Sequence, residues 1–101
     1  MYQHLCRYVP LLTLEHKEDY TTLTALCSLE GLRTKATIYQ HTLTMDAARW
    51  RGVRSVAGCM ARLSESGVVI PDYRGQWSPN EPVILREADR YLDPDWLPIL
   101  Y

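Results

Sequence analysis

The stretch from Met45 to Trp77, MDAARWRGVRSVAGCMARLSESGVVIPDYRGQW, decides the fold that the sequence predicts. We expect a short helix over residues 45–50, a longer helix over residues 53–66 and a β-hairpin over residues 68–78. Apolar residues of the longer helix recur at steps of three, four and three, which places them on one face. They are Val53, Val56, Met60 and Leu63. We expect this face to pack on the core.

The opposite surface of the longer helix is expected to carry cations and small residues. These residues are Arg51, Arg54, Ser55, Gly58 and Arg62. Residues three and four apart on a helix are neighbours, so the arginines gather on one side. A helix that buries one face and shows cations on the other is built like the recognition helix of a DNA-binding protein.

The region before the longer helix admits two registers. In the first, Thr44 caps a short helix over residues 45–50 and Gly52 permits the turn that ends it. In the second, residues 36–43 form the first helix of the pair and the recognition helix covers residues 45–66, which places Gly52 mid-helix at a cost of about 1 kcal/mol. We prefer the first register, because two helices joined by a glycine-containing turn follow the helix-turn-helix plan.

The chain before this stretch supplies a first core helix. Residues 18–32 carry apolar side chains at helical spacing, and Gly31 is suited to end the helix. Pro10 interrupts residues 1–14, which we expect to form an extended arm or a short strand. Residues 33–43 favour a strand by composition, although their spacing also suits a short helix.

A β-hairpin is expected to follow the longer helix. Gly67 is suited to close that helix, and the β-branched run over residues 68–70 suits a strand. Residues 71–75, PDYRG, supply turn chemistry, and residues 76–78 return as a second strand. Arg74 is therefore expected at the tip of the hairpin.

The segment RLSESGVV, from Arg62 to Val69, resembles the R-L-x-x-x-G-hydrophobic-hydrophobic segment of bacterial winged helix-turn-helix transcription regulators. The resemblance covers residues 20–78, at the level of the superfamily that includes MarR-like and PapI-like regulators. It implies a fold that is mainly α with a small β-hairpin, in the α+β class. It also implies that the helix before this segment enters the major groove of DNA, while the hairpin, or wing, touches the backbone or the minor groove. The short or displaced connection between the two helices departs from that pattern.

The resemblance and the charge pattern together indicate a set of DNA-binding residues. They are Arg49, Arg51, Arg54, Ser55, Gly58, Arg62, Tyr73 and Arg74. We expect Arg51, Arg54 and Arg62 to contact phosphates, with one of the first two also placed for a bidentate contact to guanine. Arg74 would follow the DNA backbone, and Tyr73 could reach a phosphate or cover the core.

Positive charge is concentrated in the middle third of the chain. Residues 33–62 hold six cations against Asp46 alone, a net charge of +5. Residues 1–32 carry a net charge of −2 and residues 63–101 a net charge of −4, so the whole chain stands at −1. A basic cluster is typical of a surface that neutralises phosphates, whereas a solvated helix face is the plainer alternative.

Length and composition indicate one globular domain. A chain of 101 residues, 47% hydrophobic and 23% charged, is too short for two separate cores. We expect a single winged-helix domain over residues 1–101, with the helix-turn-helix and wing in residues 15–78 and a C-terminal extension in residues 79–101. No apolar run reaches the roughly 20 residues of a membrane helix, and the first residues lack the features of a signal peptide. We therefore expect a cytoplasmic protein with no membrane partner.

The sequence contains no recognisable motif for catalysis or cofactor binding. It has no phosphate-binding loop, no G-x-G-x-x-G and no H-E-x-x-H, so we expect no enzyme activity and no cofactor. The three cysteines, Cys6, Cys27 and Cys59, are expected to be buried, reduced thiols. A metal site built from His4, Cys6 and His16 would lack the close ligand pairs that structural zinc sites show.

The last third of the chain suggests a second kind of function. We expect a strand over residues 83–85 and a helical turn over residues 86–92, followed by an apolar end. The candidate partner-interface residues at that end are Trp96, Leu97, Ile99, Leu100 and Tyr101. They pack back on the domain, or they form the interface of a homodimer or of a complex with another protein.

Two functions therefore follow from the sequence, and a third possibility combines them, with DNA bound by residues 49–74 and a partner by residues 81–101. The first is a small bacterial or phage transcription regulator, acting as a dimer, that reads double-stranded DNA through the helix over residues 53–66 and a wing over residues 68–78. The second is a protein-interaction module on a winged-helix scaffold, for example a phage- or plasmid-encoded inhibitor that binds a host protein complex. The acidic last third and the net charge near zero favour the second function, because dedicated DNA-binding domains are usually more basic.

Overall fold

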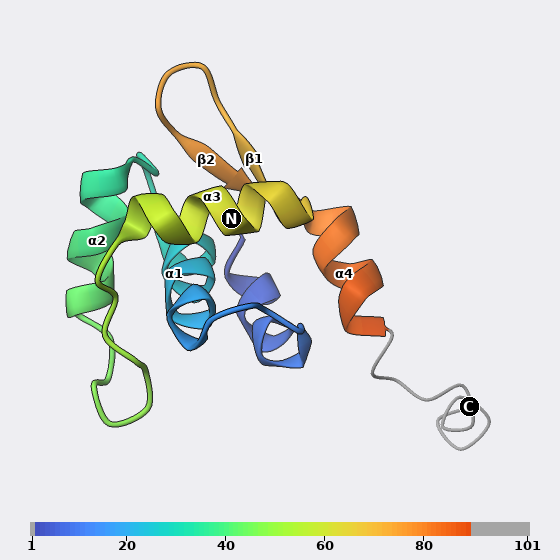
Figure 1. Cartoon of the computed structure of the whole chain (residues 1–101), viewed down its shortest axis with the longest axis horizontal. Coiled ribbons are helices and arrows are strands. Elements are labelled where there is room, and N and C mark those ends of the chain that lie inside the picture. Colours follow the sequence, from blue (N-terminus) through green and yellow to red (C-terminus); the bar gives the residue numbers. More distant parts are fainter. Residues whose placement is uncertain (1, 90–101) are drawn as a thin grey trace.

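Helix α1 (Lys17–Ser28) runs through the middle of the fold in the computed structural model, which describes residues 2–89 (Figure 1). It contacts the two 3-10 helices of the N-terminal segment as well as α2, α3 and β2. The remaining elements are η1 (Gln3–Arg7), η2 (Val9–Leu11), α2 (Lys35–Leu43), α3 (Val56–Ser66), β1 (Val69–Pro71), β2 (Trp77–Pro79) and α4 (Glu81–Asp89). The fold is therefore mainly helical with a two-stranded antiparallel sheet, which confirms the α+β class.

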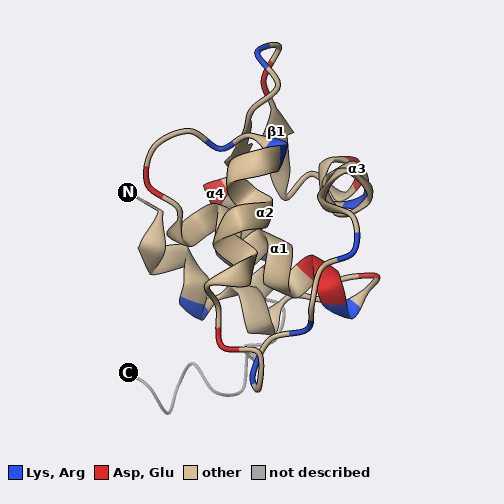
Figure 2. Ribbon diagram, turned by 90° about the vertical axis from the view of Figure 1, so that its left-hand side faces the viewer, with Lys and Arg blue, Asp and Glu red and all other residues tan. Residues whose placement is uncertain are grey.

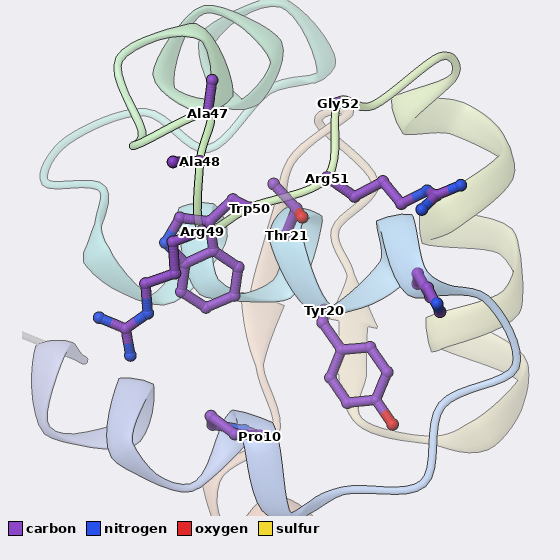
Figure 3. Close-up of a pocket in the computed structure, with 10 residues that line it drawn as sticks. Pro10, Tyr20, Thr21, Ala47, Ala48, Arg49, Trp50, Arg51 and Gly52 are labelled. Atoms are coloured by element: carbon purple, nitrogen blue, oxygen red, sulfur yellow. The ribbon is translucent and has the colours of Figure 1, made fainter.

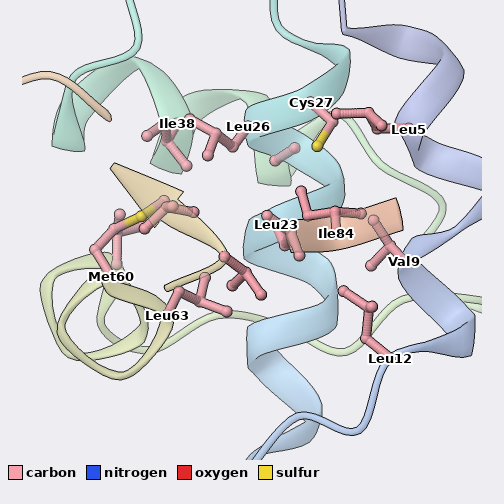
Figure 4. Packing of buried hydrophobic residues seen from close by; sticks show 14 of the residues in the cluster. Leu5, Val9, Leu12, Leu23, Leu26, Cys27, Ile38, Met60, Leu63 and Ile84 are labelled. Carbon is pink, nitrogen blue, oxygen red and sulfur yellow. The ribbon is translucent and has the colours of Figure 1, made fainter. Parts of the chain in front are cut away.

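The central position of α1 explains its burial. Every residue from Thr21 to Cys27 is buried, including three threonines, so the helix is covered on all sides instead of along one stripe. The large apolar side chains around it form one cluster (Figure 4). Those labelled in the figure are Leu5, Val9, Leu12, Leu23, Leu26, Cys27, Ile38, Met60, Leu63 and Ile84.

The end of α1 is set by a side chain from beyond the helix. Arg33 donates from Nε to the carbonyl oxygen of Leu26 at 2.9 Å and from Nη2 to that of Leu29 at 2.6 Å. These bonds satisfy carbonyl groups that the end of a helix leaves without partners. The helix ends at Ser28, earlier than the predicted residue 32, and Gly31 turns the chain with φ of +97°.

The N-terminal segment folds as two short 3-10 helices, η1 and η2, so the predicted extended arm or strand is wrong. Pro10 lies in the first turn of η2, where its missing N–H is not needed. The 3-10 turns place Leu5, Val9 and Leu12 in the core against α1. Burial of these side chains decides the conformation of a segment whose local sequence favours no regular structure.

The ambiguous region over residues 33–43 forms helix α2. Thr34 caps it, since its hydroxyl oxygen accepts a hydrogen bond from the backbone N–H of Thr37 at 3.2 Å. The helix that the second register placed over residues 36–43 is thus confirmed. Thr44, predicted to begin the next helix, is instead the residue that ends this one.

Residues 44–55 form an irregular connection to α3, so the predicted short helix over residues 45–50 is wrong. Asp46 holds a single turn, in which its carboxylate accepts from the N–H of Ala48 and its carbonyl oxygen accepts from Arg49 and Trp50. Gly52 does not adopt a positive φ and does not end a helix. The connection is therefore long, where the sequence predicted a short or displaced one.

Helix α3 begins at Val56, three residues later than predicted, because Ser55 caps it. The Ser55 hydroxyl oxygen accepts from the N–H of Gly58 at 3.1 Å. The predicted packing face is correct within the helix, where Val56, Met60 and Leu63 are buried. Val53 precedes the helix and packs against the core only in part. As predicted, Gly67 closes α3, with φ of +86°.

The hairpin forms as predicted, with strands shifted by one residue. Val69 pairs with Pro79 and Pro71 with Trp77. A third segment joins it, because Thr34 forms an isolated antiparallel bridge with Gln76 and the N–H of Trp77 donates to the carbonyl oxygen of Arg33. The chain between α1 and α2 is thereby fastened to the second strand of the hairpin.

Helix α4 replaces the strand that was predicted over residues 83–85. Ile84 and Ala88, four residues apart on one side of the helix, are both buried, and α4 contacts η1 and η2. The predicted interface residues over 96–101 lie outside the described residues. Within residues 2–89, no helix is long and apolar enough to cross a membrane.

Candidate nucleic-acid interface

The connection between α2 and α3 carries the cations that the sequence singled out. Figure 2 shows basic residues along this connection and at the tip of the hairpin. The connection is held at one end by the turn at Asp46 and at the other by Glu18 of α1, whose carboxylate accepts from the backbone N–H of Arg54 at 3.0 Å. Its course therefore brings basic side chains to the N-terminus of α3.

Arg51 and Arg54 are the cations that the structure leaves open to solvent beside α3. Both are exposed, and neither guanidinium group has a hydrogen bond or an ion pair with any residue of the described chain. They lie before the helix and not on it, because α3 begins only at Val56. Arg49 is exposed too, and its guanidinium carbon stacks 5.3 Å from the centre of the Trp50 ring.

Arg62, which was expected from the sequence to contact phosphate, is engaged inside the fold and is not one of the unpaired cations beside α3. Its Nε and Nη2 donate to both carboxylate oxygens of Asp19 at 2.8–3.2 Å, and Nη2 also lies 3.3 Å from Oε1 of Glu18. The Asp19 side chain is 1% exposed. Arg62 is therefore the partner of a buried carboxylate, and it joins α3 to the first turn of α1.

The electrostatics of this pair agree with its geometry. Burial by itself raises the pKa of Asp19, but hydrogen bonds from Arg62 and Cys59, together with the positive charge of Arg62, outweigh burial and hold this pKa below its usual value. The hydrogen bonds to Asp19 likewise raise the pKa of Arg62. Both groups are thus charged at neutral pH, and the cation of Arg62 is already neutralised.

Arg33 is also used inside the fold. Besides its two hydrogen bonds to the end of α1, its guanidinium carbon stacks 5.0 Å from the centre of the Tyr2 ring. Two of the six cations in residues 33–62 are therefore structural. The cations that remain for a ligand are Lys35, Arg49, Arg51 and Arg54.

The outward face of α3 is made of small side chains in its first half, whereas Glu65 is exposed near its end. Ala57 and Ala61 are exposed, and Gly58 between them is half-buried. A Cβ atom at Gly58 would lie 3.4 Å from the Ser55 hydroxyl oxygen that caps the helix, which is an ordinary van der Waals contact. Ser55 thus has a structural role as the cap that binds the backbone N–H of Gly58. The alanines, which sequence reasoning missed, form the surface that a ligand of the first half of α3 would meet.

The wing tip is fully in solvent. Tyr73 is 89% exposed, so it does not cover the core, and the Arg74 guanidinium carbon lies 5.3 Å from the centre of its ring. Gly75, with φ of +77°, and the carboxylate of Asp72 shape the turn that presents them. Arg74 is thus held beside an aromatic ring in the turn of the hairpin, and the hairpin projects away from the helices (Figure 1).

Lys35 was missed in the sequence because nothing local distinguishes it. It is the first residue of α2, directly after the Thr34 cap, and it is exposed. Together with Ala36 and Tyr39 it lines a small hollow against Val56, the first residue of α3. The starts of α2 and α3 therefore lie side by side and share one surface.

The residues once considered for a metal site are engaged separately. His4 contacts Glu81 at 2.9 Å, Cys6 is directed to the carbonyl oxygen of Thr24, and His16 precedes α1. In the chain from residue 2 to 89, no group of three or more metal-binding side chains is close enough to hold an ion. All three cysteines are free thiols; Cys27 and Cys59 are buried as predicted, whereas Cys6 is only half-buried.

Comparison with protein-family models, with curated proteins and with solved structures finds no match to this chain. No relative therefore supplies a family, a ligand or a partner. We infer function from the residues and geometry of this chain alone.

Proposed function

We propose that this protein is a winged helix-turn-helix DNA-binding protein that regulates transcription. The order of elements supports the proposal: α1, the bridging residue Thr34, α2, α3 and then a hairpin that follows α3 directly. This order agrees with the resemblance of the RLSESGVV segment to winged-helix regulators. The connection over residues 44–55 is longer than the three to four residues of a usual helix-turn-helix, so the proposal is for a variant with an extended turn.

The observation that carries the proposal is the pair of exposed, unengaged arginines beside the start of α3. In a protein that uses Arg33 and Arg62 for its own fold, the guanidinium groups of Arg51 and Arg54 have no partner among residues 2–89. Cations left in solvent next to a helix N-terminus suit phosphate groups, because the helix dipole also favours negative charge there. Arg74 at the wing tip provides a further contact at a distance.

In this proposal the N-terminal half of α3 enters the major groove. Ala57 and Ala61 are small enough to let the helix backbone approach the bases, and their methyl groups suit the methyl group of thymine. Arg54 contacts guanine or a phosphate at the start of the helix, while Lys35 and Arg51 contact phosphates on either side. The proposed contacts to bases therefore come from small side chains of α3 and from arginines before it, and not from arginines on the helix as the sequence predicted.

Fluorescence anisotropy with a labelled 24-base-pair duplex tests this proposal, because non-specific binding is dominated by phosphate contacts. Four phosphate contacts predict that the affinity falls about a hundredfold between 50 and 200 mM salt. Arg51→Gln and Arg54→Gln should each weaken binding and reduce the slope of log K against log salt by about one. Arg86→Gln, on the outer side of α4, is the matched control and should leave both unchanged.

The proposal fails if the duplex does not bind at 50 mM salt, or if Arg86→Gln weakens binding as much as Arg54→Gln. Selection from a pool of genomic fragments then identifies the bound sequence. A palindromic site would support the dimer that is expected from the sequence, since protein symmetry is mirrored in the operator. Light scattering of the protein without DNA measures its oligomeric state directly.

A protein partner is the second candidate function, and one observation favours it. On α2, Tyr39 is 41% exposed and Leu43 is 61% exposed, although both are large and apolar. Exposed apolar side chains on neighbouring turns of a helix suit a protein surface better than a phosphate backbone. Tyr39→Ser with Leu43→Ser should abolish binding to a protein partner but leave affinity for the duplex within about twofold.

A further inference from the structure

A cavity of about 580 Å³ lies between α1 and the connection over residues 44–55 (Figure 3). Its size is within the range of small-molecule sites, about 300–1,000 Å³. Three cations line it: Lys17, Arg49 and Arg51. No carboxylate from the described chain lines it, so the cavity has a single sign of charge. Charged groups of one sign around a hollow attract ligands of the opposite sign.

Aromatic side chains form the walls of this cavity. Trp50 comes from the connection and Tyr20 from α1, with Arg49 and Arg51 leaving the connection in opposite directions beside them (Figure 3). The Tyr20 ring is fixed, because its hydroxyl donates to the carbonyl oxygen of Leu12 at 2.6 Å and accepts from the N–H of Leu14 at 3.0 Å. These walls suit a flat ring.

One wall also contains a buried hydroxyl without a partner. Thr21 lines the cavity, is 2% exposed, and its Oγ1 has no hydrogen-bond partner. A buried polar group that is left unsatisfied is costly, so such groups are few in folded proteins. No hydrogen bond among residues 2–89 joins residues 47–52 to α1, so the hydroxyl of Thr21 can reach a ligand if binding displaces this part of the connection.

A second hollow of about 570 Å³ continues the first. It shares Lys17, Arg51 and Gly52 with the first cavity. It is also lined by Arg54 of the connection and by His16, which precedes α1. Glu18 is its one acidic neighbour, and the Glu18 carboxylate already accepts from the Arg54 backbone N–H and from Arg62. The two hollows therefore provide an aromatic end and a cationic end that meet at Lys17 and Arg51.

We propose that this cavity binds a small organic anion that carries a flat ring. The ring lies between Trp50 and Tyr20, the anionic group is bound by Lys17 and Arg51, and the hydroxyl of Thr21 donates to the ligand. The ligand neutralises Arg51, a residue that the proposed function assigns to DNA. The site thus makes the protein a sensor whose DNA affinity falls when the anion is bound; this last step rests on the proposed function, whereas the binding site does not.

Titration with 2-naphthoate, followed by NMR of the protein without DNA, tests the site. The indole N–H of Trp50 and the backbone N–H groups of Lys17 and Thr21 should shift together and saturate. The neutral analogue 2-naphthalenemethanol should bind at least about tenfold more weakly, because it lacks the charge that two cations bind. Equal affinity for the acid and the alcohol, or shifts confined to other parts of the chain, overturns the proposal.

Variants locate the contacts within the cavity. Lys17→Gln and Arg51→Gln should each weaken 2-naphthoate binding about tenfold, whereas Arg86→Gln on α4 should not change it. Thr21→Val keeps the shape of the side chain and should weaken binding about threefold while the protein remains folded. Unchanged affinity in the Lys17 and Arg51 variants overturns the site, and unchanged affinity in the Thr21 variant overturns the role of the hydroxyl.

The coupling to DNA has its own readout. Saturating 2-naphthoate should lower the affinity of the wild-type protein for the 24-base-pair duplex and leave that of Arg51→Gln unchanged, since the shared residue is already removed. Binding of the anion with no effect on the duplex refutes the coupling and keeps the site. Absence of duplex binding at any anion concentration refutes the proposed function instead.

Discussion

Replacing Arg62 tests the ion pair that joins α3 to α1. The change Arg62→Met keeps most of the apolar stem of the side chain and removes the guanidinium group. It leaves the carboxylate of Asp19, 1% exposed, without its three hydrogen bonds from Arg62. A buried charge that loses its partner keeps the full cost of leaving water, so the folded state should be strongly destabilised.

The exposed fractions set the size of the effect. Removing one partner of a buried ion pair costs about 3–5 kcal/mol. Because the side chain of Arg62 is 24% exposed and that of Glu18 is 18% exposed, water screens part of the interaction between these charges. We therefore expect the lower end, about 3 kcal/mol of unfolding free energy. In a domain of this size that corresponds to a fall in Tm of about 12 °C or more.

Urea unfolding followed by circular dichroism measures the change. Arg54→Met is the matched control, because its guanidinium group has no partner in the described chain, and it should stay within about 0.5 kcal/mol of wild type. The double variant Asp19→Asn with Arg62→Met should be more stable than Arg62→Met alone, since it no longer buries an unpaired charge. An Arg62→Met protein as stable as the control refutes the structural role of the pair.

The pH dependence of the difference in unfolding free energy between wild type and Arg62→Met provides a second check. The pKa of Asp19 is lowered in the folded protein, so the stability that its pairing provides is present above the ordinary carboxyl pKa, near 4, and is lost as pH falls through the folded value. The difference in unfolding free energy between wild type and Arg62→Met should therefore be constant from pH 6 to 8 and become smaller toward pH 3. A gap that widens on acidification contradicts this assignment.

Three further changes test the local structure. Gly67→Ala should cost about 1 kcal/mol in urea unfolding, because φ is +86° there, whereas Gly52→Ala, with no atom within 4 Å of the new Cβ and no positive φ, should be close to neutral. Thr34→Ala removes the cap of α2 and should cost about 1 kcal/mol; a loss below about 0.3 kcal/mol in the same assay would show that the cap is dispensable. Burial raises the pKa of the Cys27 and Cys59 thiols to about 12, so both should react with a thiol reagent at pH 8 only as fast as the protein unfolds, and rapid labelling would contradict their burial.

Local chemistry determined the parts of the fold that depend on a few neighbouring residues. The apolar spacing of Val56, Met60 and Leu63 predicted the packing face of α3, and Gly67 predicted its end. The turn over residues 71–75 predicted the hairpin and placed Arg74 at its tip. Periodicity, a left-handed glycine and turn residues act within a few positions, so the sequence shows them directly.

Tertiary contacts decided the rest. Residues 83–85 form part of a helix and not a strand, because α4 gains burial of Ile84 and Ala88. The end of the connection over residues 44–55 is held beside α1 because Glu18, 36 residues from Arg54 along the chain, accepts a hydrogen bond from the backbone N–H of Arg54. Neither contact has a local signature.

The same division applies to the candidate site. The sequence determined that cations gather in the middle third of the chain, because the charged residues of each third can be counted directly. Only the tertiary structure decided which of them remain for a ligand: Arg62 lies 43 residues from Asp19 along the chain, yet it is used to neutralise that buried carboxylate, while Arg51 and Arg54 stay in solvent. The physical reason is that a charge acts on whatever folding brings within a few ångströms, and sequence separation does not measure that distance.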